Sequence, residues 1–241
     1  MALKKDHAGV ITVKVVFWGP TLAGKTTALT IYKVLKSLED PANVYKFLKL
    51  EDPTGRTLFF DQAIFGLGRN PTSGMPFLKY HVFTVPGQMR HKAQRKVVLE
   101  GVQGLVIVID SDRDRWEENK EALIELNDLI GEKIAQNMLP YVLMLNKMDL
   151  PESERISPQE VSKLLVEAGM HGTLRDAHAR IITTSCLKAR DELKDLFQNK
   201  SEDELKDKDG RLKRELRPQS VQRIVKPVEQ VVREIVVKHL T

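Results

Sequence analysis

Apolar and polar residues alternate along the chain in segments that predict strands and helices in turn. Residues 11–18, ITVKVVFW, are rich in β-branched side chains and predict a strand. Residues 25–38 carry apolar side chains at helical spacing and predict a helix. The continuous apolar runs GLVIVID at 104–110 and YVLMLN at 141–146 predict strands that are covered on both faces.

The same pattern continues through the rest of the first two hundred residues. It predicts further strands at 77–85 and 179–185, a helix at 117–134, and a helix at 157–169 that is capped by Ser157 and ends at Gly169. Residues 39–76 are rich in Pro and Gly and are expected to be irregular, with one apolar patch, TLFFDQAIF. Alternating strands and helices predict an α/β fold of three layers, a mostly parallel sheet with helices on both faces. Ligands of such sheets bind at the carboxyl ends of the strands.

The end of the chain has a different pattern and predicts a separate segment. We expect one domain over residues 1–198, followed at 199–241 by a charged linker and an amphipathic helix. Valine and isoleucine recur at helical spacing after Pro218, with Pro227 interrupting the stripe near its start. The stripe favours packing on the domain, with docking to a partner or a second copy as the alternative.

Composition narrows the class of protein. The formal net charge of +5 is mild and no basic cluster is evident, so no nucleic-acid partner is expected. The chain has no long apolar run for a transmembrane helix, and Lys14 breaks the N-terminal apolar stretch, which argues against a signal peptide. A single cysteine, Cys186, suits a reducing compartment, and we expect a cytoplasmic protein.

A phosphate-binding loop is the strongest motif. GPTLAGKT at 19–26 matches G-x-x-x-x-G-K-[ST] between a predicted strand and a predicted helix. Its backbone N–H groups and the helix N-terminus would hold a nucleoside triphosphate, with the charge of Lys25 on the phosphates and the hydroxyl of Thr26 on Mg²⁺. The predicted nucleotide contacts in this stretch are Gly19, Leu22, Ala23, Gly24, Lys25, Thr26 and Thr27.

A guanine-binding motif follows a buried strand. In NKMD at 146–149, Asp149 is placed to accept the N1–H and N2–H₂ donors that guanine, unlike adenine, presents together. Asn146 is expected to tie neighbouring loops together, and the Lys147 stem to lie along the base. TTSC at 183–186 is expected to contact the base through backbone groups around Ser185, Cys186 and Leu187, with Cys186 as a small semi-buried residue and not a nucleophile.

The order of these motifs resembles the small Ras-like GTPases. The stretches PTGRTLFFD at 53–61 and TVPGQ at 84–88 are similar to those of the MglA-type gliding-motility and cell-polarity GTPases of prokaryotes. The resemblance covers roughly residues 13–197. It implies the P-loop NTPase fold, GTP and GDP as ligands with Mg²⁺, and an activator of the roadblock fold and MglB type. It identifies no effector.

Hydrolysis of GTP needs a second Mg²⁺-binding hydroxyl, a group that orients water and a cation for developing charge. Thr57 is the candidate hydroxyl, Gln88 the candidate for orienting water, and the N–H of Gly87 a candidate contact of the γ-phosphate. Lys25 supplies one cation. The resemblance implies a second, Arg56, as an arginine finger provided by the same chain.

Two positions bear on the hydrolysis rate. Thr84 stands where Ras-like proteins carry aspartate, and the MglA-type pattern also has threonine at this place. Asp61 is the closest candidate carboxylate in sequence to replace that aspartate. Thr21 stands where glycine is usual and is expected to crowd Gln88, which predicts slow turnover. Two alternatives stay open, a nucleotide-binding scaffold with negligible hydrolysis and a P-loop kinase of nucleotides or small molecules.

Overall fold

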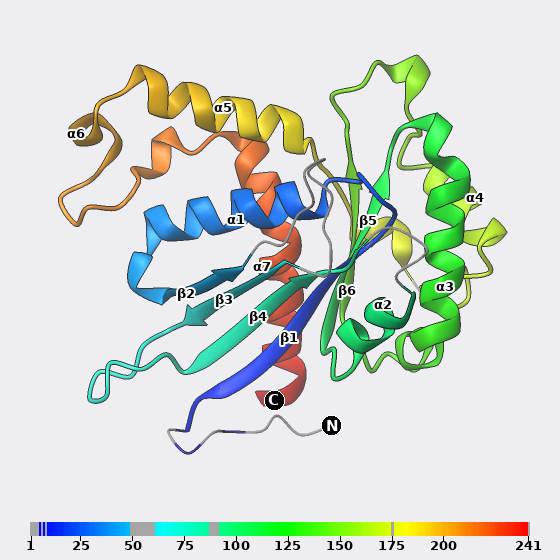
Figure 1. Cartoon of the computed structure of the whole chain (residues 1–241), viewed down its shortest axis with the longest axis horizontal. Helices are drawn as coiled ribbons and strands as arrows, with labels where there is room; N and C mark the ends of the chain where they lie inside the picture. The colour runs from blue at the N-terminus through cyan, green and yellow to red at the C-terminus, as the bar shows by residue number, and fades with distance from the viewer. Residues whose placement is uncertain are drawn as a thin grey trace.

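The computed structural model describes residues 5, 7, 9–48, 61–86, 92–174 and 176–240, with only the backbone of Lys92 and Leu240. Within these residues one seven-stranded sheet has the order β2-β3-β4-β1-β5-β6-β7 (Figure 1). The strands are β1 (Ile11–Trp18), β2 (Val44–Leu48), β3 (Gln62–Leu67), β4 (Leu78–Thr84), β5 (Gly104–Asp110), β6 (Tyr141–Asn146) and β7 (Ile181–Thr183). In this sheet order, all neighbouring strands from β4 through β1, β5 and β6 to β7 are parallel. Strand β3 pairs antiparallel with both of its neighbours, β2 and β4.

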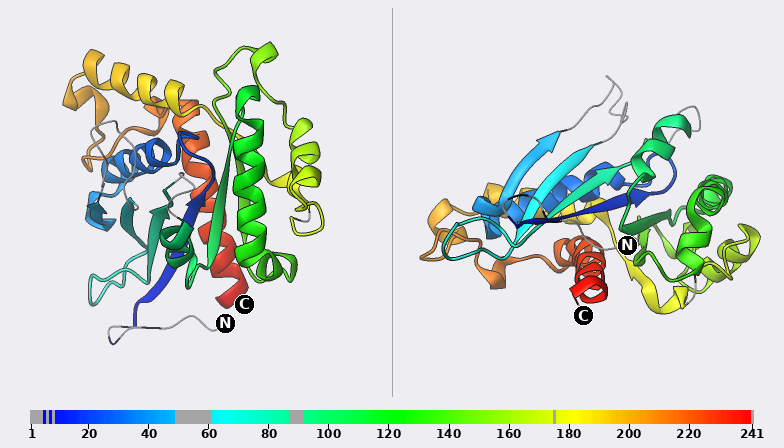
Figure 2. Two further views of the ribbon diagram at one scale, coloured as in Figure 1. Left: turned by 45° about the vertical axis from the view of Figure 1, so that its right-hand side comes forward. Right: turned by 90° about the horizontal axis from the view of Figure 1, so that it is seen from below.

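Helices cover both faces of the sheet, which confirms the predicted three-layer α/β architecture (Figure 2). One face packs against α1 (Lys25–Glu39), α5 (Cys186–Asn199) and α7 (Gln219–Leu240), and the other against α2 (Lys92–Leu99), α3 (Trp116–Ala135) and α4 (Glu160–Glu167). The short helix α6 (Glu202–Leu205) lies between α5 and α7 in the chain. The side chains of β1 alternate between two hydrophobic clusters, one under each layer of helices.

The prediction that residues 39–76 are irregular is confirmed for residues 68–76, which form turns and loops, and is wrong where η1, β2 and β3 form. A 3₁₀ turn, η1 (Pro41–Asn43), leads into β2, and β3 follows at residues 62–67. Strand β2 is an edge strand with no fully buried residue, so it carries no apolar alternation that the sequence could reveal. Backbone pairing with β3, and not a pattern of its own side chains, makes this segment a strand.

The start of α4 differs from the prediction by a few residues. Ser157 and Glu160 exchange hydrogen bonds, with the Ser157 N–H donating to Glu160 Oε2 (2.8 Å) and the Glu160 N–H to Ser157 Oγ (3.3 Å). The regular helix nevertheless begins only at Glu160. Ser157 thus makes the predicted kind of capping contact one turn ahead of the helix.

Helix α7 completes the core on one face of the sheet. Its apolar stripe is fully buried at Val221, Ile224, Val228, Val231 and Ile235. It packs on α1, α5 and β5, and the helix continues through Pro227 without a break. Packing on the domain therefore accounts for the stripe. The boundary predicted between residues 198 and 199 stays a prediction, because shared packing does not say which part folds alone.

A glycine makes room for α7 on the sheet. A Cβ added at Gly104, the first residue of β5, would lie 2.3 Å from Val231 Cγ1 and 2.9 Å from Ile235 Cδ1. Any larger residue there would push the helix away from the sheet, so the contact between β5 and α7 is close.

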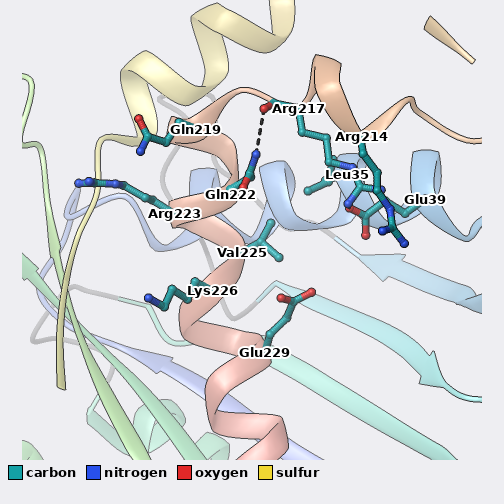
Figure 3. Close-up of a pocket in the computed structure, with 10 residues that line it drawn as sticks. All are labelled: Leu35, Glu39, Arg214, Arg217, Gln219, Gln222, Arg223, Val225, Lys226 and Glu229. Carbon is teal, nitrogen blue, oxygen red and sulfur yellow. Dashed lines mark hydrogen bonds and ion pairs between the residues drawn. The ribbon is translucent and has the colours of Figure 1, made fainter. Parts of the chain in front are cut away.

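The outward face of α7 is polar. With the end of α1 and the turn η6 (Arg214–Leu216) it borders an open groove of about 680 Å³ (Figure 3). Arg217 forms an ion pair with Glu39 (2.9 Å), and its carbonyl accepts a hydrogen bond from Gln222 Nε2 (3.0 Å).

No helix among the described residues combines the length and apolar content needed to cross a bilayer.

Candidate functional site

Three of the predicted motifs meet at the carboxyl edge of the sheet. The phosphate loop joins β1 to α1, NKMD follows β6, and TTSC runs from the end of β7 into α5. Strands β1, β5, β6 and β7 are parallel neighbours, so their carboxyl ends lie together. This is the edge where open α/β sheets bind ligands.

Two glycines permit the curled shape of the phosphate loop. Gly19 has a φ of 147°, and a Cβ there would lie 2.3 Å from the carbonyl oxygen of Val108. Gly24 has a φ of 96°, and a Cβ there would lie 2.3 Å from Asn146 Nδ2. Both positions combine a backbone conformation that favours glycine with a close approach of another chain segment.

Lys25 points its ammonium into the loop. The side chain is buried, and Nζ donates to the carbonyl oxygens of Gly19 (2.9 Å) and Pro20 (2.6 Å). Burial, with the nearby charge of Arg95 as a further cause, lowers the pKa of Lys25 to about 7, while Asp61 and Asp110 oppose this. A poorly solvated ammonium of this kind gains strongly from an anionic neighbour, which fits a phosphate ligand.

Asn146 joins the guanine-binding motif to the phosphate loop. Its Nδ2 donates to the carbonyl oxygen of Ala23 (2.8 Å), and its Oδ1 accepts from Thr184 Oγ1 (3.1 Å) and the Cys186 N–H (3.0 Å). One buried amide therefore links three loops, as the sequence predicts for this residue.

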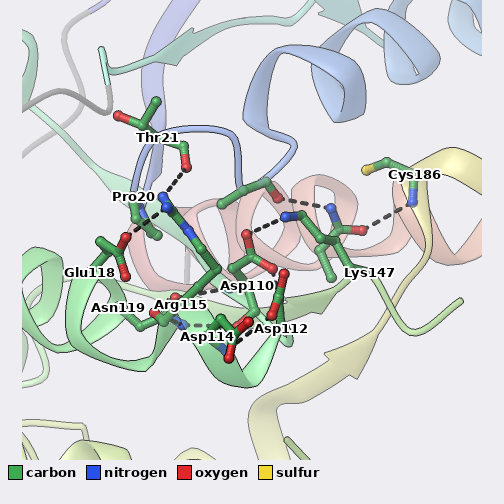
Figure 4. A network of polar contacts seen from close by, with 12 residues as sticks. Pro20, Thr21, Asp110, Asp112, Asp114, Arg115, Glu118, Asn119, Lys147 and Cys186 are labelled. Carbon is green, nitrogen blue, oxygen red and sulfur yellow. Dashed lines mark hydrogen bonds and ion pairs between the residues drawn. The ribbon is translucent and has the colours of Figure 1, made fainter. Parts of the chain in front are cut away.

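The other polar residues of the motif are held from neighbouring elements. Lys147 Nζ lies 2.6 Å from Asp110 Oδ2, at the end of β5 (Figure 4). Burial raises the pKa of Asp110, and Lys147 opposes that rise. Asp149 is exposed and accepts a hydrogen bond from Ser185 Oγ, which itself accepts from the Lys188 N–H (3.0 Å) at the start of α5.

Asp110 is a site residue that the sequence analysis missed. It is fully buried and stands directly after the apolar run of β5, at the same carboxyl edge as the motifs. A polar residue at the end of a buried strand was the available signal, since the same argument located Asn146.

Thr26, Asp61 and Thr84 form a hydroxyl–carboxylate cluster beside the phosphate loop. Asp61 Oδ2 accepts hydrogen bonds from Thr26 Oγ1 (2.5 Å) and Thr84 Oγ1 (2.9 Å), and the Asp61 N–H donates to Thr84 Oγ1 (3.0 Å). Asp61 and Thr84 are fully buried. The expected replacement carboxylate thus lies against the residue predicted to bind Mg²⁺. These are hard oxygen donors, which suit Mg²⁺ completed by phosphate and water oxygens.

The remaining predicted site residues divide into two groups. Leu22 and Leu187 are exposed, while Thr27 is half-buried at the start of α1. Four predicted residues lie outside the described residues, namely Arg56, Thr57, Gly87 and Gln88.

The thiol of Cys186 is expected to be unreactive in the folded protein. It is 4% exposed, and burial raises its pKa to about 12. At pH 8 it is therefore almost wholly protonated, and the reactive thiolate is scarce. We expect N-ethylmaleimide to label the native chain slowly and the chain in guanidinium chloride rapidly. Equal rates in the two states would contradict the buried position.

The fold and the linked loops define a P-loop nucleotide-binding protein with a guanine-specific motif, a Ras-like small GTPase. Comparison with known proteins agrees. Residues 73–203 match the ADP-ribosylation factor family (Arf). The chain belongs to this family of small GTPases and is of the MglA type.

The relatives support this placement. The chain is 39% identical over 156 residues to the mutual gliding-motility protein MglA of Myxococcus xanthus (strain DK1622), which covers 64% of this chain and 76% of that protein. It is 35% and 32% identical over 75 residues to ADP-ribosylation factor-like protein 6 of Caenorhabditis briggsae and Caenorhabditis elegans, respectively. Each of those matches covers 31% of this chain and 38% of the relative. The family supports a GTP-binding switch with GTPase activity.

Proposed function

We propose that the protein is a switch that binds GTP and GDP with Mg²⁺, hydrolyses GTP slowly and recruits partners in the GTP state. The observation that carries this proposal is the bond from Asn146 to the Ala23 carbonyl. It couples the guanine-binding motif to the phosphate loop, so that one ligand with both groups contacts both. A phosphate loop alone would not favour guanine.

The proposed roles in hydrolysis are supported by the contacts around Thr26 and Lys25 and by the resemblance to the family. Thr26 and Thr57 would hold Mg²⁺, and Asp61 would support it through its hydrogen bond with Thr26. The ion polarises phosphate oxygens when bound. Gln88 orients the attacking water, while Lys25 and Arg56 stabilise the charge that develops on the phosphates.

A comparison of GTP with ATP by isothermal titration in Mg²⁺ tests the proposal. We expect GTP and GDP to bind and ATP to bind far more weakly, because adenine does not present the pair of hydrogen-bond donors that Asp149 would accept from guanine. Tighter binding of ATP would favour the P-loop kinase and would overturn the proposal.

Phosphate release from GTP separates the switch from a scaffold with negligible hydrolysis. We expect slow release from the protein alone and faster release with an activator. The similarity to the protein named MglA suggests an activator of MglB type and roadblock fold. Release that stays at the buffer rate over hours, with and without the activator, would favour the scaffold.

We place the protein in the cytoplasm.

Replacing Thr21 by glycine is expected to raise the single-turnover rate of GTP hydrolysis. The threonine side chain stands in the phosphate loop at a position where glycine leaves room for Gln88. The affinity for GDP is expected to change little, since the effect is steric and falls on hydrolysis. A rate equal to or below that of the unmodified protein would contradict the crowding argument.

A further inference from the structure

The phosphate loop contains a non-glycine residue in a disfavoured backbone conformation. Leu22 has a φ of 63°, in the left-handed region. Its side chain is 61% exposed, so burial contributes little to holding it there. A conformation of this kind persists only where the surrounding structure imposes it, and such residues gather at ligand-binding sites.

Arg115 contacts the loop at the preceding residue. It ends the turn η3 (Arg113–Arg115), which connects β5 to α3, and its Nη2 donates to the carbonyl oxygen of Thr21 (3.1 Å) (Figure 4). Its Nη1 forms an ion pair with Glu118 Oε1 (2.6 Å). Its own carbonyl oxygen accepts from Asn119 Nδ2 (2.9 Å). Both ends of Arg115 are therefore fixed to α3 while the guanidinium holds the loop.

The geometry of the peptide bond gives this contact a consequence. The Thr21 carbonyl and the Leu22 N–H belong to one planar trans peptide, in which the two groups point in opposite directions. With the carbonyl turned towards Arg115, the N–H of Leu22 is turned away from α3. Inward-pointing N–H groups of this loop are the donors that bind phosphate.

We propose that Arg115 is a positioning residue for phosphate binding. It clamps the peptide between Thr21 and Leu22 in the orientation that presents the Leu22 N–H to the nucleotide, and it offsets the strain at Leu22. The guanidinium itself contacts the loop backbone and no phosphate. This inference rests on the proposed function to the extent that it needs a phosphate ligand.

Replacing Arg115 by glutamine tests the clamp. We expect the affinity for GDP to fall about ten-fold, mainly through faster dissociation, with the unfolding temperature little changed. The matched control is Arg113→Gln, in the same turn, whose ion pair with Glu160 (2.7 Å) is exposed and reaches α4. That variant is expected to bind GDP as the unmodified protein does.

A rescue experiment distinguishes clamping from a general structural role. In a Leu22→Gly background the left-handed conformation costs little, because glycine adopts positive φ freely. There Arg115→Gln is expected to lower the GDP affinity by less than about two-fold. An unchanged affinity in the single variant, or an equal loss in both backgrounds, would overturn the proposal.

The proposed function can fail separately. If the unmodified protein binds no guanine nucleotide, the proposed function is wrong, and the four variants are then compared with inorganic pyrophosphate. Pyrophosphate uses the phosphate loop without the guanine-binding motif. A loss of pyrophosphate affinity in Arg115→Gln that Leu22→Gly suppresses would still support the clamp. Absence of this pattern would overturn the clamp.

Discussion

Replacing Asp61 by asparagine is expected to weaken Mg²⁺-dependent GTP binding by about 10- to 100-fold. Asp61 Oδ2 accepts hydrogen bonds from both Thr26 and Thr84, and Asp61 is fully buried beside the phosphate loop. The asparagine variant keeps the size of the side chain but removes the negative charge that balances the ion. GTP titrations with Mg²⁺ and with EDTA measure the effect, which should be confined to the Mg²⁺ series.

Exchanging the side chains of Asp61 and Thr84 tests whether Asp61, directly before β3, replaces the aspartate that Ras-like proteins carry at position 84, the end of β4. Thr84→Asp alone is expected to destabilise the fold, because it buries a second carboxylate where Thr84 Oγ1 now lies 2.9 Å from Asp61 Oδ2. The double variant Asp61→Thr with Thr84→Asp should recover stability and part of the Mg²⁺ dependence. Thr84→Ser keeps the hydroxyl and serves as the control. If Thr84→Asp alone binds GTP as well as the unmodified protein, the replacement argument fails.

Ending the chain at Pro218 is expected to abolish cooperative folding. The truncation removes five fully buried residues of α7, namely Val221, Ile224, Val228, Val231 and Ile235. Each is worth roughly 1.5–3 kcal/mol of burial. Their sum is comparable with the whole stability of a typical domain, about 5–15 kcal/mol. Circular dichroism during heating should show no sharp transition.

Single substitutions in α7 test the same packing more gently. Ile235→Ala is expected to lower the free energy of unfolding by about 2–5 kcal/mol, because the cavity lies under a closely packed helix. Val237→Ala, at a 52% exposed position of the same helix, should change it by less than about 0.5 kcal/mol. A truncated chain that melts cooperatively near the temperature of the full chain would instead support residues 1–198 as an independent domain.

The contiguous motifs and the buried central strands could be predicted from the sequence. Strands β5 and β6 have the predicted bounds, because a strand covered on both faces leaves a continuous apolar run. The phosphate loop and NKMD are readable because a few adjacent residues carry their chemistry. Strand β2 could not be predicted, since an edge strand needs no apolar pattern and takes its order from its neighbour.

Only the tertiary structure decided which distant residues act together. Asp61 and Thr84 are 23 positions apart, and Arg115 contacts Thr21 across 94 positions. It also decided between the two fates of the apolar stripe of α7, which the sequence left open because an amphipathic helix has the same pattern on a domain or on a partner. Local pattern determines what a buried or amphipathic segment forms, as for β5, β6 and α7, but not what an edge strand such as β2 forms. Its partners depend on long-range packing, which no short window of sequence contains.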